Sequence, residues 1–311
     1  TEAGTNISTS DDNTAIGYNA MHGNDSTAGT GTGRNTGMGS SVLYAITTGQ
    51  QNVAIGTSAG STLTTTSHTV LIGHNAGLAI NSTDANGTVA ISMEAGKAIT
   101  SGASNVAIGY EALKTTTTGL RNIAIGYEAM HDTDAGSSSS DSDNNIFIGY
   151  TAGGGAWANA KSEFNVAIGS NVMQGVLNGA VYNSALGYFA LASVTSGDKN
   201  VAVGSEAGYA ITSATNNTFV GYQSGFALID GTSNTAMGML SLSTDCEDHN
   251  TAIGYYALKV CTSSDNTAVG AYAGDEITSG ERNTAVGHSA IGAAAGNSNT
   301  GIGFEALLSS T

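Results

Sequence analysis

Side chains capable of chemistry are sparse in this chain of 311 residues. Its histidines are scattered, at His22, His68, His74, His131, His249 and His288. None of them pairs with a nucleophile in the arrangement that general base catalysis needs. Gly-x-Ser triplets occur without the strand, sharp turn and helix that would make their serine a nucleophile. The sequence therefore predicts a protein that is not an enzyme, with no cofactor and no metal centre.

An acidic, serine-rich stretch near residues 131–144 carries Asp132, Asp134, Asp141 and Asp143. Carboxylates are the ligands that hard cations such as Ca²⁺ prefer, so a cation site is one interpretation. The spacing of the four aspartates matches no known calcium loop. A solvated surface loop is the interpretation that we prefer.

Two cysteines and the only tryptophan complete the candidates. Cys246 and Cys261 are 15 residues apart, close to the length of an internal repeat. They would then lie on adjacent turns of the chain, within the range of a disulfide. The alternative is a pair of buried thiols. Trp157 lies in an insert, residues 153–164, and is either an exposed recognition anchor or a side chain folded back over the repeat.

The elements that would position these residues come from the repeat. The stretch Asn122–Met130 reads Asn, Ile, Ala, Ile, Gly, Tyr, Glu, Ala, Met, and 17 copies can be aligned on its glycine. The intervals are most often 17 residues and range from 16 to 23. One copy carries Ser92 in place of the glycine. A period of this size is typical of a solenoid.

The pattern within the unit indicates a β-strand. Aliphatic or β-branched residues such as Ile123 and Ile125 flank a small residue such as Ala124. Because alternate residues of a strand point to opposite faces, the two faces differ in size. We predict that the Ile face is the coil interior and that the Ala face makes a tight contact outside it. A second short strand is predicted after the glycine, and the Thr, Ser, Gly and Asn tails are predicted turns.

Asparagine precedes the motif in 15 of the 17 copies. Stacked at one coil position, these side chains would form a hydrogen-bonded ladder; the alternative is that each one favours only its own turn. We assign a structural role to the repeat residues, represented by Asn122, Ile123, Ile125, Gly126, Asn105, Ile108, Gly109, Asn250, Ile253 and Gly254.

Composition narrows the classes of protein that the chain can belong to. Forty-four glycines with no proline are typical of many tight turns that join strands. In such strands every backbone N–H takes part in a hydrogen bond to a neighbouring strand, which proline could not provide. The net charge of −16, from 24 acidic and 8 basic residues, argues against binding to nucleic acid or anionic membranes. No apolar run approaches the roughly 18 residues of a membrane helix.

These observations predict an all-β parallel β-solenoid of about 17 coils. Residues 1–12 are expected to form a lead-in or cap. Residues 13–311 are expected to form a single repeat domain, with loop inserts near 22–34, 131–144 and 153–164.

The repeat resembles two related groups of known proteins. Asn52-Val53-Ala54-Ile55-Gly56, like Asn105–Gly109 and Asn165–Gly169, is similar to the motif in the heads of trimeric autotransporter adhesins. The continuation Tyr-x-Ala-Leu, as at Tyr110–Leu113 and Tyr255–Leu258, resembles the repeat region of phage tail-fibre and tail-spike proteins. The likeness covers residues 13–307.

The resemblance implies a left-handed β-roll assembled as a parallel homotrimer. It further implies a structural fibre of a virion that supports attachment to a host surface, with other virion proteins and a host receptor as partners and with no insertion into a membrane. A bacterial surface adhesin or extracellular filament subunit is the alternative. An ice-binding solenoid is a minor alternative, because the threonine runs at 64–66 and 115–118 keep no constant register.

Overall fold

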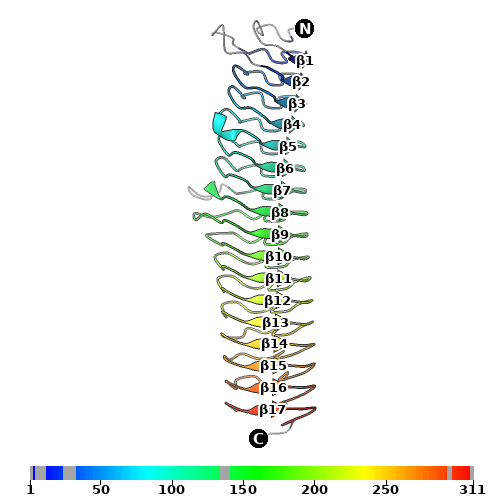
Figure 1. Ribbon diagram of the computed structural model, residues 1–311, viewed down its shortest axis with the longest axis vertical. Helices are drawn as coiled ribbons and strands as arrows, with labels where there is room; N and C mark the ends of the chain where they lie inside the picture. Colours follow the sequence, from blue (N-terminus) through cyan, green and yellow to red (C-terminus); the bar gives the residue numbers. More distant parts are fainter. Residues whose placement is uncertain (1–2, 4–11, 24–32, 134–140, 293–295, 309–311) are drawn as a thin grey trace. The chain divides into compact units, whose positions relative to one another are not determined.

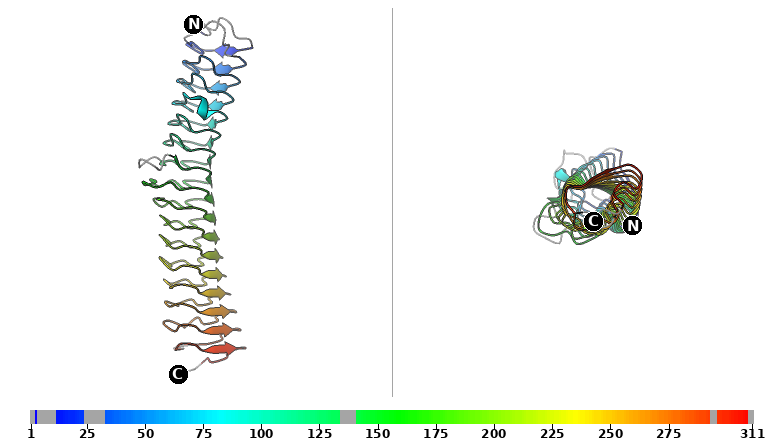
Figure 2. Two further views of the ribbon diagram at one scale, coloured as in Figure 1. Left: turned by 60° about the vertical axis from the view of Figure 1, so that its left-hand side comes forward. Right: turned by 90° about the horizontal axis from the view of Figure 1, so that it is seen from below.

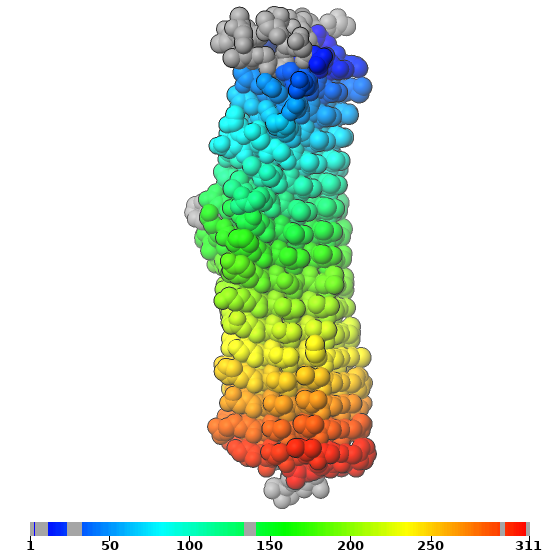
Figure 3. All heavy atoms as spheres, viewed as in Figure 1, coloured from blue at the N-terminus to red at the C-terminus, as the bar shows by residue number. Residues whose placement is uncertain are grey.

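The computed structural model describes residues 3, 12–23, 33–133, 141–292 and 296–308. They belong to two compact units, residues 1–163 and residues 164–311. Each unit is an all-β parallel solenoid in which every coil contributes one short strand (Figures 1 and 2). The space-filling view shows the side chains of successive coils as parallel bands within each unit (Figure 3). The predicted all-β parallel β-solenoid is therefore confirmed.

The described part of unit 1 contains eight three-residue strands and the 3₁₀ turn η1 (Thr83–Ala85). The strands are β1 (Thr14–Ile16), β2 (Thr36–Met38), β3 (Val53–Ile55), β4 (Val70–Ile72), β5 (Val89–Ile91), β6 (Val106–Ile108), β7 (Ile123–Ile125) and β8 (Ile146–Ile148).

Nine strands of the same length lie in the described residues of unit 2. They are β9 (Val166–Ile168), β10 (Ser184–Leu186), β11 (Val201–Val203), β12 (Thr218–Val220), β13 (Thr235–Met237), β14 (Thr251–Ile253), β15 (Thr267–Val269), β16 (Thr284–Val286) and β17 (Thr300–Ile302). Each predicted copy of the repeat thus carries one strand, ending on the residue before its glycine or before Ser92.

Within each unit, neighbouring strands pair in parallel without any slip in register. In β6 and β7, for example, Ala107 is opposite Ala124 and Ile108 is opposite Ile125. Equivalent residues of consecutive coils therefore stack in rows, and each row is identified by its distance in sequence from the motif glycine.

The prediction of which strand face is interior was wrong. Ala124 is fully buried, as are Ala107 and Ala252, whereas Ile123 and Ile125 are only partly buried and point outward. The interior is thin, because residues three, four and seven places after the glycine also fill it, as Ala129 and Met130 do. Only a small side chain fits between them at the strand centre, so the larger aliphatic residues occupy the outer face.

Large residues at a strand centre are accommodated by glycine elsewhere in the coil. Phe147 and Phe219 take the place of alanine in β8 and β12 and are fully buried. A Cβ added to Gly153 would lie 2.5 Å from the Phe147 ring, and one added to Gly225 would lie 2.4 Å from the Phe219 ring. Both glycines stand four places after the motif glycine, where Met130 stands in β7's coil. The total side-chain volume in the interior is therefore similar from coil to coil, although the size of the side chain at any one position varies.

The motif glycine is required by the close approach of successive backbones. Gly126 has φ +136°, and a Cβ built on it would lie 2.2 Å from the Gly149 carbonyl oxygen of the next coil. No side chain fits there without displacing backbone. Ser92 adopts φ 115° at this position, a conformation that costs a non-glycine residue about 1–3 kcal/mol.

The predicted second strand is not formed. After the glycine the chain turns, with Glu128 at φ 50° and Met130 at φ 49° in the left-handed region. This curled segment still bonds to the next coil, since the Met130 N–H donates to the Ala152 carbonyl at 2.9 Å. Alternating left-handed residues give stacking contacts without the extended conformation that defines a strand.

The asparagine ladder is confirmed in both units. In unit 1 the Asn122 N–H donates to Asn105 Oδ1 at 2.8 Å, and the Asn145 N–H donates to Asn122 Oδ1 at 3.0 Å. Asn122 Nδ2 also donates to the Ser142 carbonyl at 2.8 Å. In unit 2 the same backbone bond joins each successive pair of Asn165, Asn183, Asn200, Asn217, Asn234, Asn250, Asn266, Asn283 and Asn299.

The two coils without the asparagine use threonine instead. The Thr69 N–H and hydroxyl both donate to Asn52 Oδ1, at 3.0 and 2.8 Å. The Thr88 hydroxyl donates to the Ala85 carbonyl at 2.9 Å. A short hydroxyl satisfies the same buried position but offers fewer donors than an amide.

Much of the predicted lead-in and of two predicted inserts lies outside the described residues. The lead-in 1–12 is described only at Ala3 and Asp12, the insert near 22–34 only at 22–23 and 33–34, and the insert near 131–144 only at 131–133 and 141–144. The insert 153–164 is described throughout. The single repeat domain over 13–311 remains a prediction.

The reversed strand faces give a direct test. We expect Ala124→Asp to destabilise the fold by on the order of 4 kcal/mol, because it buries an unpaired carboxylate in the thin interior. Ile125→Asp, one residue away, should retain the β circular-dichroism spectrum and a cooperative melt, because its carboxylate faces outward. Equal loss of structure in the two variants would contradict this assignment of the faces.

Candidate interaction surface

The outer face of the strands is an exposed aliphatic surface in each unit. From β3 to β8 both outward residues of every strand are Val or Ile. Several members of the row before the glycine remain more than a third exposed, namely Ile16, Met38, Ile55, Ile168, Leu186, Val203, Met237, Ile253, Val269 and Ile302. Isolated exposed apolar residues are ordinary, but a continuous row of them marks an interaction surface.

The outer face changes character within unit 2. From β12 to β17 the first strand residue is threonine, in the register Thr218, Thr235, Thr251, Thr267, Thr284 and Thr300. The second outward residue stays Val, Ile or Met. These threonines form a regular column, which does not include the threonine runs at residues 64–66 and 115–118. Because its neighbouring column is aliphatic, the face does not provide the Thr-x-Thr array of an ice-binding surface.

Aromatic side chains stack from coil to coil beside this face. The rings of Tyr110 and Tyr127 lie 5.0 Å apart, and those of Tyr127 and Tyr150 lie 5.3 Å apart. Hydrogen bonds to the adjacent carboxylates of Glu111 and Glu128 raise the pKa of Tyr110 and of Tyr127. Because stacking covers the ring faces, the edges and hydroxyl groups of the tyrosines are the parts that remain accessible at the surface.

Trp157 is not an exposed recognition anchor. It is fully buried, its ring lies 5.6 Å from that of Phe147, and its Nε1 donates to the Gly153 carbonyl at 2.9 Å. The structure thus has the alternative in which the insert folds back over the coil. Its indole N–H finds a backbone acceptor, as a buried tryptophan requires.

Cys246 and Cys261 are free, buried thiols in this structure. Their sulfur atoms lie 3.2 and 3.4 Å from the same acceptor, the Ser263 carbonyl oxygen. The hydrogen bond with Cys261 raises the pKa of the Cys246 thiol, and burial adds to the effect. The two residues do lie on adjacent coils, as their spacing predicted.

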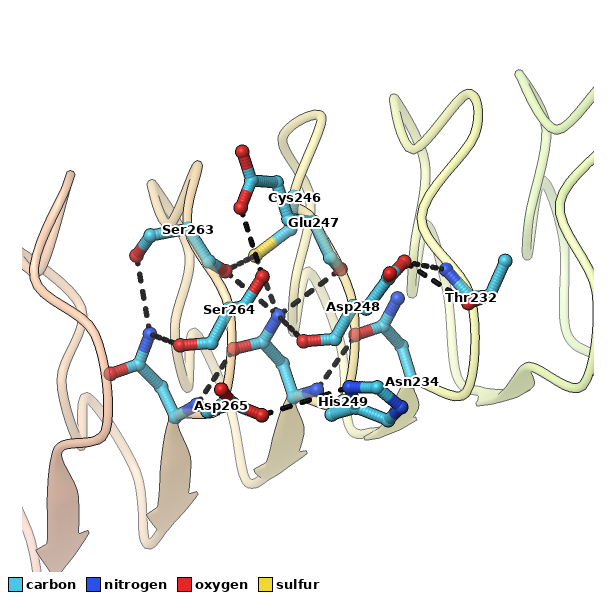
Figure 4. A network of polar contacts seen from close by, with 11 residues as sticks. Thr232, Asn234, Cys246, Glu247, Asp248, His249, Ser263, Ser264 and Asp265 are labelled. Atoms are coloured by element: carbon cyan, nitrogen blue, oxygen red, sulfur yellow. Dashed lines mark hydrogen bonds and ion pairs between the residues drawn. The ribbon is translucent and has the colours of Figure 1, made fainter.

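A network of polar contacts surrounds Cys246 (Figure 4). Asn250 Nδ2 donates to the Ser263 carbonyl at 2.9 Å and lies 3.2 Å from the Cys246 sulfur. Asp248 accepts from the Thr232 N–H at 2.7 Å and from its hydroxyl at 3.0 Å. The contacts satisfy backbone and side-chain groups of consecutive turns, which is a structural task.

Asp248 belongs to a second ladder that sequence reasoning missed. In each case a short polar side chain two places before the asparagine position accepts from the N–H at the same place in the preceding coil. The acceptors are Ser67, Asn86, Asp143, Asp198, Asp248 and Asn297. The recurring Asp-x-Asn triplets at 143–145, 198–200 and 248–250 were the available signal.

The asparagine ladder has one defect in unit 2. Asn234 is buried, and its Nδ2 has no hydrogen-bond partner. Asn234 precedes Gly238, at which the first of three 16-residue intervals between motif glycines begins. The backbone bond from Asn250 to Asn234 Oδ1, at 2.8 Å, is intact.

Two of the four aspartates proposed as a cation site, Asp141 and Asp143, serve as turn acceptors. Asp143 Oδ1 accepts from the Leu120 N–H at 2.6 Å, and Asp141 accepts from the Thr118 hydroxyl. Asp134 lies outside the described residues. No group of three or more His, Cys, Asp or Glu side chains in the described part of the chain is arranged to hold a metal ion.

Charged side chains on three successive coils of unit 1 form one network. Lys114 Nζ lies 2.9 Å from Glu111 and 3.2 Å from Glu94, and Glu94 lies 2.8 Å from Lys97. His131 Nε2 lies 2.9 Å from Glu111. The hydrogen bond from Lys97, aided by Lys114, lowers the pKa of Glu94 to about 2. The network holds coils together from outside while remaining open to solvent.

The chain has no match among protein-family models or among curated proteins. Within the described ranges, no helix has the length and apolar character needed to cross a bilayer.

Acid should weaken the contacts of Glu94. A carboxyl whose folded pKa is depressed stabilises the fold fully above about pH 4.5, and this contribution is lost as pH falls toward about 2. We expect the difference in Tm between wild type and Glu94→Gln to be constant at neutral pH and to shrink across that window. A difference that does not vary with pH would contradict the ion-pair assignment.

Burial should protect both thiols. Native protein is expected to take up no maleimide, and protein unfolded in denaturant should take up two, as counted by mass spectrometry. Absence of labelling after unfolding without reductant would show instead that a disulfide links Cys246 to Cys261.

Proposed function

We propose that the protein is a non-enzymatic fibre of a virion, a shaft that supports attachment to a host surface. The observation that carries the proposal is the row of aliphatic residues just before the motif glycine, which is exposed or half-buried on the outer strand face of every coil in each unit. A lone solenoid would leave this face in water, whereas a fibre built of several chains would bury it. The likeness of the repeat to phage tail-fibre proteins supports the virion, and the adhesin-like form of the motif keeps a bacterial surface filament as the alternative.

The assembly that we propose is a parallel homotrimer of left-handed coils. Three identical strand faces placed around one axis would bring Ile108 and Ile125 of each chain together with the same residues of the others. Burial of apolar area contributes roughly 25 cal/mol per Å², so many rungs with two outward residues each add up to a strong association. The small residues stay inside each chain and take no part in this contact.

The polar remainder of the surface suits a fibre that has to stay soluble. The net charge of −16 keeps such a long assembly from associating with itself non-specifically. Asparagine rows, turn acceptors and threonine hydroxyls are engaged in joining coils, which is consistent with a mechanical role. Contacts with a host receptor and with other virion proteins would come from the sides and turns of the coils.

Association through the strand face is tested by the double variant Ile108→Asp/Ile125→Asp. Wild-type protein is expected to sediment at three times the chain mass. The variant should sediment as a folded monomer, because six carboxylates would be brought together at the axis of a trimer. A matched control is Lys161→Asp, which alters the net charge by the same two units at an exposed side chain in an insert and should stay trimeric.

A monomeric wild type with a β spectrum would overturn the trimer. The virion assignment has its own test, in which antibodies against the chain are applied to purified phage particles and to bacterial cells. Labelling of thin fibres on particles supports the proposal, and labelling confined to the cell surface supports the alternative.

A further inference from the structure

The two buried cysteines of unit 2 are placed so that they can react with each other. Their sulfur atoms lie 3.2 and 3.4 Å from a single atom, the Ser263 carbonyl oxygen, although Cys246 and Cys261 belong to adjacent coils. Figure 4 shows the Cys246 sulfur directed at this carbonyl. The two thiols are also hydrogen-bonded to each other. Their side chains are therefore near enough to be joined by a disulfide once both thiols are oxidised.

Hydrogen bonding prepares one sulfur of the pair for reaction. When one proton leaves the pair, the Cys246 thiol donates to the Cys261 sulfur, which lowers the pKa of the Cys261 thiol to about 7 against the opposing effect of burial. Asn266 Nδ2 also donates to this sulfur, at 3.6 Å. Because the thiolate is the reactive form of cysteine, the pair holds a nucleophile at neutral pH.

A hollow of about 380 Å³ on unit 2 has Cys246 in its wall. Four carboxylates line the same hollow, those of Asp230, Asp245, Glu247 and Asp248. They repel anionic oxidants such as oxidised glutathione. Bulky reagents are excluded as well, because Cys246 is only 2% exposed and Cys261 is not exposed at all. A neutral oxidant close to water in size meets neither obstacle, and hydrogen peroxide is such an oxidant.

We propose that hydrogen peroxide converts Cys246 and Cys261 into a disulfide that closes residues 246–261 into a covalent ring. The thiolate sulfur attacks one peroxide oxygen, the O–O bond breaks, and a sulfenic acid forms. The hydroxide that leaves takes up the proton lost by the first thiol. The second sulfur then attacks the sulfenic sulfur, which forms the S–S bond and releases water. Two thiols are oxidised, and one peroxide is reduced to two molecules of water.

The hydrogen bonds around the pair tolerate the loss of both thiol protons. The Ser263 carbonyl keeps Asn250 Nδ2 as a donor at 2.9 Å, and Asn266 Nδ2 keeps the Gly280 carbonyl as an acceptor at 2.9 Å. Oxidation therefore leaves these members of the asparagine ladder paired.

The covalent ring would comprise the coil that carries β14. This coil could then no longer unwind separately from its neighbours, because closing a loop restricts the unfolded chain. Oxidation thus locks one coil of unit 2. The proposal is independent of the fibre assignment, since it concerns a single chain.

Mass spectrometry tests the reaction. Reduced protein is freed of reductant, treated with hydrogen peroxide while native, and then unfolded and alkylated. Untreated protein is expected to carry two alkyl groups and treated protein none, with the disulfide mapped between Cys246 and Cys261 in peptides. Oxidised glutathione in place of peroxide should leave two alkylated thiols. A glutathione adduct on native protein would contradict the role of the acidic hollow.

The effect on stability is measured against Cys246→Ser/Cys261→Ser. This control is needed because peroxide also attacks exposed methionines such as Met237 and Met239. Peroxide should raise the Tm of wild type relative to that of the treated double variant, and reductant should abolish the difference. The proposal is overturned if both thiols are still alkylated after peroxide, if the disulfide joins two chains, or if the two treated proteins share one Tm.

Discussion

Close stacking of one backbone directly on the next is the constraint from which the other features of each unit follow. At the motif glycine the Cα of one coil faces the carbonyl of the next so closely that even a methyl group has no room. The register of the parallel strands is then fixed, because a slip of one residue would place a side chain at that contact. Every other position is held at a constant height above its equivalent, and rows of identical chemistry become possible.

Rows of amides and short polar side chains use this arrangement to satisfy the buried backbone. The asparagine ladder and the second ladder two places earlier each let a side chain of one coil bond to the backbone of a neighbouring coil. An unsatisfied buried polar group costs about 1–3 kcal/mol, so such rows are worth keeping through many coils. Within the described part of the asparagine row, the Nδ2 of Asn234 is buried without a hydrogen-bond partner.

The same constraint separates a thin interior from a broad outer face. Inside, alanine at the strand centre is exchanged for phenylalanine only where a glycine elsewhere in the coil vacates the volume. Outside, no neighbour within the chain limits the size of a side chain, and Val, Ile and Leu collect there with tyrosines beside them.

The sequence by itself determined the stacked solenoid, the strand before the glycine in each repeat, the stacking of the asparagines and the adjacency of Cys246 and Cys261. All of these depend on the period alone, because equal spacing places equal residues on top of one another. Only the tertiary structure decided that Ala124 faces inward and Ile125 outward, since alternation distinguishes two faces without saying which is enclosed. It also decided that Trp157 is buried and that the segment after the glycine curls rather than extends. Those outcomes depend on the volume left inside the coil and on left-handed backbone at Glu128 and Met130, which neither hydrophobicity nor spacing specifies.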